Sequence, residues 1–225
     1  MNKSSRWNLI PLLLALVPVG VLVRHIVYYS GTTHAYADDF LVNLRIVTDV
    51  RFDNFDLLFL IAPYNGHIQF PTHLLAYVFA RLGVWNPTLD AWINFSLGLV
   101  CVALVIGVAR YFHPERWMWY TPIIAGLMLT PDLGPVWFNG AWNLWFFMHF
   151  GMMMTVYALL FVQPRWLAVV VACLGAIFSM LSMATGLAAW LVLGLALIVL
   201  GWRQWWAYVI AVGTGTAAFL LFLLV

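Results

Sequence analysis

Residues 205–225 read WWAYVIAVGTGTAAFLLFLLV, a run of 21 positions without a single charged side chain. A helix needs about 20 apolar residues to cross the hydrocarbon core of a bilayer. A soluble fold could not hide this run together with the other apolar segments of the chain. The stretch therefore predicts a transmembrane helix and places the protein in the class of integral membrane proteins.

The composition of the whole chain agrees with this class. Hydrophobic residues make up 65% of the 225 positions and charged residues only 8%, whereas a soluble domain carries about a quarter charged residues. The 13 Trp and nine Tyr residues suit a membrane protein, because amphipathic rings favour the headgroup region. The net charge of +2 comes without a basic patch, so the expected partner is the lipid bilayer and no nucleic acid.

Working backward from residues 205–225, six further apolar segments predict helices at residues 9–29, 91–109, 117–130, 142–162, 166–183 and 187–201. We therefore predict an all-α fold, a polytopic bundle of about seven transmembrane helices in a single domain over residues 1–225. Its parts are a first helix in residues 1–29, a long extracytoplasmic loop with interfacial helices in residues 30–89, and the remaining helices in residues 90–225. The apolar run continues to the last residue, and we expect the sequence to be the front part of a longer protein.

The positions of the basic residues predict the topology. If the N-terminus is cytoplasmic, six of the ten Lys and Arg residues fall beside cytoplasmic helix ends, as the positive-inside rule requires. These residues are Lys3, Arg6, Arg110, Arg116, Arg165 and Arg203. The expected location is the inner (plasma) membrane, with residues 30–89 on the extracytoplasmic face.

Residues 68–85 could instead form another transmembrane helix. That stretch contains Pro71, His73 and Arg81, and its continuous apolar run covers only residues 74–80. Inserting it would also turn Arg110 outward. We therefore predict a helix that lies in the outer interface with its apolar face toward the lipid.

Adjacent carboxylates at Asp38 and Asp39 are the first candidates for catalysis. Because like charges repel, one of the two should have a raised pKa unless a cation is close. One could act as general base on a hydroxyl while the other binds a metal or caps the helix that begins near Phe40. The simpler interpretation is that the pair is only a helix cap at the membrane surface.

Further polar candidates are Asn65, His67, His73, Arg81 and Asp132. The two histidines could join the aspartates around a divalent cation, although a spacing of six residues does not put them on one helix face. The loop around Asp132 is rich in turn residues and is followed by tryptophans. It is either an interfacial turn with an aromatic belt or a platform for an acceptor or sugar.

The order of these motifs resembles that of a known family. The series is formed by Asp38-Asp39, Asn65-Gly66-His67 with Pro71, Gly83-Val84-Trp85-Asn86-Pro87, Asn94, Arg110, Ser182-Met183-Ala184-Thr185-Gly186-Leu187, Trp190 and Arg203. It is similar to the N-terminal half of bacterial multi-spanning glycosyltransferases of the GT-C fold, relatives of the protein O-mannosyltransferases. The similarity covers residues 7–206.

The resemblance implies transfer of a sugar from a polyprenyl-phosphate donor to an acceptor on the extracytoplasmic face. In that case Asp38 or Asp39 would be the base that deprotonates the acceptor hydroxyl, and Asn65 and His67 would lie near the donor phosphate or the acceptor. The family often has charged residues where this chain has Gly66, Ile68 and Thr72. Positive charge for the phosphate would then come from Arg45, Arg51, Arg81 and His73.

A second function, from a different class, is a non-catalytic subunit or assembly factor of a membrane complex. It would use the same helices and the tryptophan-rich surface only for packing against other membrane subunits. A transporter is a weaker candidate, because the predicted spans contain almost no ionisable residue near the midplane.

Overall fold

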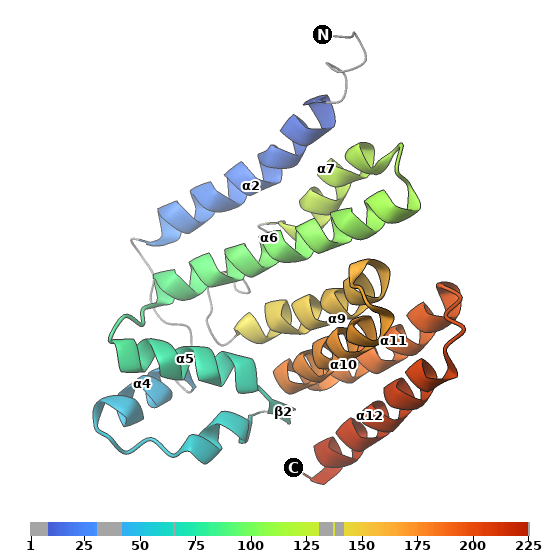
Figure 1. Ribbon diagram of the computed structural model, residues 1–225. Coiled ribbons are helices and arrows are strands. Elements are labelled where there is room, and N and C mark those ends of the chain that lie inside the picture. Colours follow the sequence, from blue (N-terminus) through green and yellow to red (C-terminus); the bar gives the residue numbers. More distant parts are fainter. Residues whose placement is uncertain (1–8, 31–41, 65, 131–136, 138–141, 225) are drawn as a thin grey trace.

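The computed structural model describes residues 9–30, 42–64, 66–130, 137 and 142–224, and this part of the chain is almost entirely helical (Figure 1). The α-helices are α2 (Leu9–Ser30), α4 (Asn43–Arg51), α5 (Phe70–Leu82), α6 (Pro87–Phe112), α7 (Trp117–Met128), α9 (Asn143–Phe161), α10 (Arg165–Ser182), α11 (Ala188–Val199) and α12 (Trp205–Leu224). Two short 3-10 helices, η1 (Leu57–Ile61) and η4 (Ala184–Leu187), and an antiparallel pair of two-residue strands, β1 (Pro63–Tyr64) and β2 (His67–Ile68), complete the described elements. The predicted all-α bundle is confirmed.

All seven apolar segments form helices, but they differ in length. Five helices are long and apolar enough to cross a membrane, namely α2, α6, α9, α10 and α12. Helices α7 and α11 have 12 residues each, or about 18 Å of helix against a hydrocarbon core of about 30 Å. The protein is therefore a helical membrane protein. Five of its seven apolar segments form helices that are long enough to cross the bilayer.

The start of α6 lies four residues before the predicted residue 91 because of its capping residues. The Asn86 side chain accepts a hydrogen bond from the Leu89 backbone N–H at 2.8 Å, and Pro87 occupies the first turn. Both are favourable at a helix N-terminus, as is an acidic residue in the first turn. Asp90 fills that place and accepts a hydrogen bond from the indole N–H of Trp85 at 3.0 Å. The cap therefore accounts for the four added residues at the start of α6, which has 26 residues and also ends later than predicted, at Phe112.

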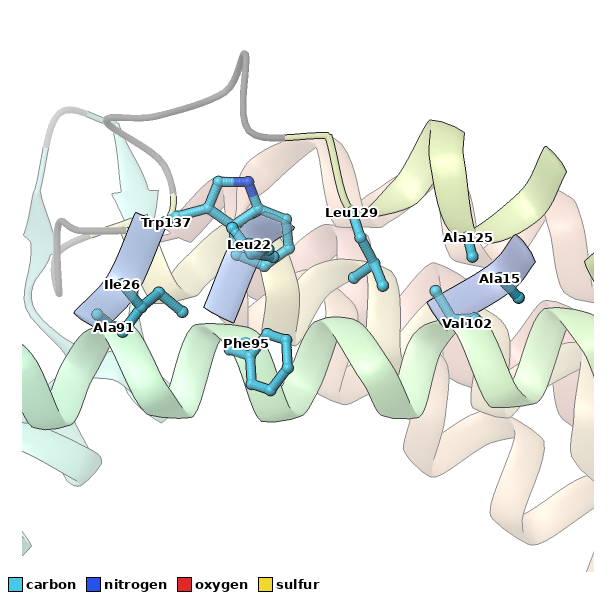
Figure 2. Close-up of a cluster of buried hydrophobic side chains, with 9 residues drawn as sticks. All are labelled: Ala15, Leu22, Ile26, Ala91, Phe95, Val102, Ala125, Leu129 and Trp137. Carbon is cyan, nitrogen blue, oxygen red and sulfur yellow. The ribbon is translucent and has the colours of Figure 1, made fainter. Parts of the chain in front are cut away.

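Helices α2, α6 and α7 share one apolar core. Figure 2 shows its nine buried side chains, which come from these three helices together with Leu129 and Trp137. The Trp137 side chain donates from its indole N–H to the Thr130 backbone carbonyl at 2.8 Å, and Asn94 donates to the Trp137 carbonyl at 3.3 Å. The first contact ties Trp137 to Thr130 just after α7, and the second joins the connection between α7 and α9 to α6.

Helices α9 and α10 approach each other closely through small residues. A Cβ placed on Gly151 would come within 2.5 Å of the Gly175 carbonyl oxygen. Thr155 donates to the carbonyl of Ala172 on α10 at 3.1 Å, and Ser179 donates to the carbonyl of Met148 on α9 at 2.9 Å. Small residues and hydroxyl hydrogen bonds are the usual means of pairing helices in lipid.

Helices α4 and α5 lie together at one end of the bundle, which we call the α5 end (Figure 1). Helix α2 ends there, helices α6 and α9 begin there, and α10 ends there beside β2 and α5. The opposite end carries the exposed basic residues Arg110, Arg116, Arg165 and Arg203. The bundle thus separates the basic helix ends from α4 and α5 as the sequence predicts.

Helix α5 lies within residues 68–85, where an interfacial helix is predicted, and is shorter than that stretch. It runs from Phe70 to Leu82 and is followed by Gly83, whose φ of 68° is the left-handed conformation that suits a glycine after a helix. One face packs on α4 and buries Ala76. The opposite face leaves Leu74, Val78 and Leu82 exposed at a spacing of four residues. An exposed apolar stripe of this kind is what an interfacial helix presents to lipid.

Candidate functional site

The buried polar side chains of the protein gather at the α5 end. Nine of the 11 buried polar residues in the described part of the chain lie within the two turns of a helix that are nearest to this end, or cap α5. These nine are Asn43, Gln69, Thr72, His73, Asp90, Asn94, Asn143, Ser179 and Ser182. Buried polar groups are costly and need hydrogen-bond partners. Their concentration marks the α5 end as the candidate functional site.

Several of these groups face no hydrogen-bond partner. Among the described residues, none is hydrogen-bonded to the side-chain oxygens of Gln69, Thr72 and Asn143, and the ring nitrogens of His73 have only the nearby backbone of Phe59 and Leu60 as partners. Leaving a buried donor or acceptor unpaired costs about 1–3 kcal/mol. Three of the four residues belong to the first turn of α5 or its cap. The first turn of α5 therefore supplies hydrogen-bonding groups for a polar ligand or for water.

His73 lies fully inside the α5 end, with 0% of its surface exposed. Its ring stacks on Phe59 with the ring centroids 5.2 Å apart. Burial lowers the pKa of His73, and the nearby backbone of Leu60 and Phe59 opposes this only in part. His73 is therefore a neutral ring near pH 7, able to accept one hydrogen bond and donate another, and it supplies no positive charge for a phosphate.

His67 connects the β-hairpin to η4. The backbone N–H of Ala184 donates a hydrogen bond to Nδ1 of His67 at 3.4 Å. Because a backbone N–H can only donate, Nδ1 is the unprotonated nitrogen and the ring proton lies on Nε2. The half-buried ring therefore offers an N–H donor from Nε2 at the α5 end.

Arg81 lies away from the two histidines in the last turn of α5. It follows His73 by eight residues, a rise of about 12 Å along the helix. The Arg81 side chain is exposed, pairs with Asp53 at 3.5 Å and donates to the Tyr77 hydroxyl at 3.3 Å. The hydrogen bond with Tyr77 is the main cause of its raised pKa. The structure thus separates Arg81 from the buried polar groups with which the sequence grouped it.

Arg45 lines a polar cavity of about 260 Å³ between α4 and η1, together with Asp49, Asn54 and Asp56. Its guanidinium lies 3.6 Å from the Asp49 carboxylate and 4.9 Å from the centre of the Phe59 ring. The neighbouring carboxylates offset the charge of Arg45. This cavity is better suited to a hydroxylated ligand than to an anion.

The other predicted site residues, Asp38, Asp39, Asn65 and Asp132, lie outside the described residues. In the sequence, Asp38 and Asp39 stand between α2 and α4, and Asn65 stands between β1 and β2. Within the described part of the chain, no group of three His, Cys, Asp or Glu side chains could hold a metal ion. A divalent cation bound by the aspartates and histidines stays a prediction.

The sequence did not identify Gln69 or Thr72 as candidate site residues. Gln69 and Thr72 stand on either side of Phe70-Pro71 at the start of an apolar helix. Polar residues at a helix start are ordinarily solvated, so their position alone does not indicate burial. Only the packing of α5 against α9 and α10 shows that these side chains are buried.

Comparisons of the chain with models of protein families, with curated proteins and with solved structures find no match.

Proposed function

We propose that the protein is a membrane glycosyltransferase that transfers a sugar from a polyprenyl-phosphate donor to an acceptor hydroxyl at the α5 end. The observation that carries this proposal is the group of buried side chains around the first turn of α5 that have no partner among the described residues. A sugar, with many hydroxyl groups, is a ligand that can satisfy several donors and acceptors at once.

The reaction needs a base, and Asp38 and Asp39 are the candidates. They stand in the sequence between the end of α2 and the start of α4, and both of those helix ends lie at the α5 end. The carboxylate takes the proton of the acceptor hydroxyl. The acceptor oxygen then bonds to the anomeric carbon of the sugar, and the bond between that carbon and the phosphate oxygen breaks. The polyprenyl phosphate leaves with the bonding electron pair.

The departing phosphate needs hydrogen-bond donors that are already in position. His67 offers Nε2–H for this role, because the hydrogen bond from Ala184 assigns the ring proton to that nitrogen. Arg45 and Arg81 are weaker candidates, since each is paired with an aspartate. His73 is a neutral hydrogen-bonding partner for a hydroxyl group.

The arrangement of α5 suits a donor that is anchored in lipid. The exposed stripe of Leu74, Val78 and Leu82 would lie at the outer surface of the inner membrane, with the N-terminus in the cytoplasm. A lipid phosphate would then meet the buried polar groups at the level of the headgroups, while its chain stays in the bilayer.

Transfer from a labelled polyprenyl-phosphate sugar, measured in membranes that contain the full chain, tests the proposal. We expect Asp→Asn at the base position to lower the rate by about 10²–10⁴-fold, which is the usual contribution of a general base. Glu115→Gln is the control, because Glu115 is an exposed carboxylate between α6 and α7, away from the α5 end. It should leave the rate within about twofold, since changes at exposed charges away from the site contribute little.

Expression level and thermal unfolding of each variant separate lost chemistry from lost folding. Full transfer by the Asp38→Asn/Asp39→Asn double variant would contradict the proposal. A wild-type chain that transfers no sugar in membranes, but purifies with other membrane proteins, would favour the non-catalytic subunit.

A further inference from the structure

The end of the bundle opposite α4 and α5, which we call the basic end, carries four exposed arginines. They are Arg110 in the last turn of α6, Arg116 before α7, Arg165 at the start of α10 and Arg203 before α12. The two ion pairs that arginines form within the described residues both lie at the α5 end. Glu115 is the single described carboxylate at the basic end, so four positive charges stand there against one negative charge.

Tryptophan rings hold two of these arginines in place. The guanidinium carbon of Arg110 lies 5.5 Å from the centre of the Trp117 ring, and that of Arg165 lies 5.6 Å from the centre of the Trp202 ring. An aromatic face attracts a cation at this distance. Among the described residues, neither guanidinium has a hydrogen-bonding or ion-pairing partner. Both groups are therefore positioned by a ring while their N–H donors stay available.

The two Arg–Trp pairs lie on adjoining helix ends (Figure 1). The ring of Tyr111, next to Arg110, packs edge-on against the ring of Phe161 at the end of α9, with the centroids 5.7 Å apart. Residues 162–164 then join Phe161 to Arg165 at the start of α10. The two pairs therefore belong to one surface of the folded protein, although they come from different segments of the sequence.

The aromatic residues of the basic end indicate the depth of this surface in the membrane. Six of the 13 tryptophans of the chain lie there, namely Trp117, Trp119, Trp166, Trp202, Trp205 and Trp206. Tryptophan is enriched at the level of the headgroups, because its ring is apolar and its N–H is polar. Two of these six rings hold the guanidinium groups, which therefore lie at the level of the lipid phosphates.

We propose that the basic end binds the headgroups of anionic phospholipids, and that Arg110 and Arg165 hold the lipid phosphates. A guanidinium can donate two parallel hydrogen bonds to the oxygens of one phosphate. A zwitterionic headgroup brings its own cation toward the four arginines, so a headgroup of net negative charge is favoured. Each basic residue near an anionic membrane surface contributes about fivefold in affinity.

An acidic soluble protein would match the charge of the basic end, but it does not fit the depth of the arginines. A soluble partner would have to displace the lipid headgroups that surround the tryptophans. The inference concerns the end of the bundle opposite the candidate site, so it does not rest on the proposed function.

Native mass spectrometry of the purified full chain in detergent tests the inference. The probes are phosphatidylglycerol and phosphatidylcholine with the same acyl chains, titrated separately. We expect phosphatidylglycerol to bind the wild type at least tenfold more tightly than phosphatidylcholine. Arg165→Gln should weaken the binding of phosphatidylglycerol about fivefold, and Arg110→Gln/Arg165→Gln should weaken it at least tenfold. The affinity of both variants for phosphatidylcholine should stay within about twofold of the wild type.

Arg51→Gln is the matched control, because it removes the same charge from an exposed arginine at the α5 end. It should bind both lipids as the wild type does. Unchanged binding of phosphatidylcholine, together with thermal unfolding in the same detergent, shows that the basic-end variants stay folded.

Three results would each overturn the inference. They are equal affinities of the wild type for the two lipids, equal weakening of phosphatidylglycerol binding by Arg51→Gln and Arg165→Gln, and full displacement of the lipid by free glycerol phosphate. The first would show that the arginines do not select an anionic headgroup. The second would show that net charge alone controls binding, and the third that the ligand is a free anion.

Discussion

The backbone N–H of Ala184 donates a hydrogen bond to Nδ1 of His67 at 3.4 Å, joining residues 117 positions apart. The contact ties the β-hairpin before α5 to the 3-10 turn between α10 and α11. It also leaves the ring proton on Nε2. One histidine therefore has two separable roles, since one nitrogen holds two segments together and the other is available to a substrate.

Substitutions of His67 can separate these roles. An Asn side chain can place its carbonyl oxygen near the position of Nδ1 and keep the bond from Ala184, but it lacks the Nε2 donor. If His67 only links the segments, His67→Asn should transfer sugar like the wild type while His67→Ala transfers less. We expect both variants to lose roughly 10-fold or more in kcat/KM, because a donor to the phosphate is missing in both. Transfer rates at varied donor concentration measure this, with thermal unfolding as the folding control.

The buried ring of His73 predicts that the α5 end weakens in acid. The ordinary pKa of 6.5 applies to the unfolded chain, and burial lowers the pKa in the folded state. Below pH 6.5 the unfolded state therefore binds more protons than the folded state, and stability rises with pH. The stabilisation is present above pH 6.5 and is lost as the pH falls toward the lowered folded pKa.

Hydrogen exchange of α4 and α5 between about pH 5 and pH 8 measures this effect, after correction for the intrinsic pH dependence of exchange. We expect protection of both helices to fall on the acid side. His73→Phe keeps a ring to stack on Phe59 and should remove most of the change. An equal loss of protection in His73→Phe and in the wild type would show that another group controls it.

Close packing of α9 on α10 predicts strong sensitivity at Gly151. A Cβ there would meet the Gly175 carbonyl oxygen at 2.5 Å and the Ser179 nitrogen at 2.7 Å. Backbone atoms cannot move aside like a side chain, so Gly151→Ala should destabilise the protein by about 1–3 kcal/mol. Gly194→Ala on α11 is the matched control, since nothing lies within 4 Å of its added Cβ. Thermal unfolding in detergent compares the two, and equal melting temperatures would contradict the close approach.

The proposed orientation predicts which engineered cysteines react from outside the cell. Asn54 and Gln163 are both exposed. Asn54 lies between α4 and η1 at the α5 end, whereas Gln163 lies in the connection from α9 to α10 at the opposite end. We expect Asn54→Cys to react with an impermeant thiol reagent and Gln163→Cys to react only after the membrane is opened. The two native cysteines, Cys101 and Cys173, are buried and should give little background. Labelling of Gln163→Cys in intact cells would reverse the topology.

Much of the fold follows from the sequence alone. Each of the seven apolar segments forms a helix, because a backbone in lipid must satisfy its hydrogen bonds within the segment. Gly83 and the Asn86-Pro87 pair bound α5 and α6 through local chemistry. The gathering of basic helix ends, such as Arg110 and Arg165, follows from the alternating direction of the helices.

The candidate site depended on tertiary structure. His73 and Arg81 belong to the same helix, but one is buried beneath η1 and the other is exposed beside Asp53. Hydropathy reports the character of a segment but does not say which neighbour covers which face. The pairing of His67 with Ala184 joins distant parts of the chain, and no local pattern encodes such a contact.

The same reason explains why the sequence alone does not show that His149 is exposed beside a cavity. The sequence determined that His149 lies in a membrane span, because the surrounding apolar run is long enough to cross. Only the packing of α6 and α7 against α9 decided that its ring borders a cavity rather than a helix contact, since a cavity forms between elements and depends on how they meet.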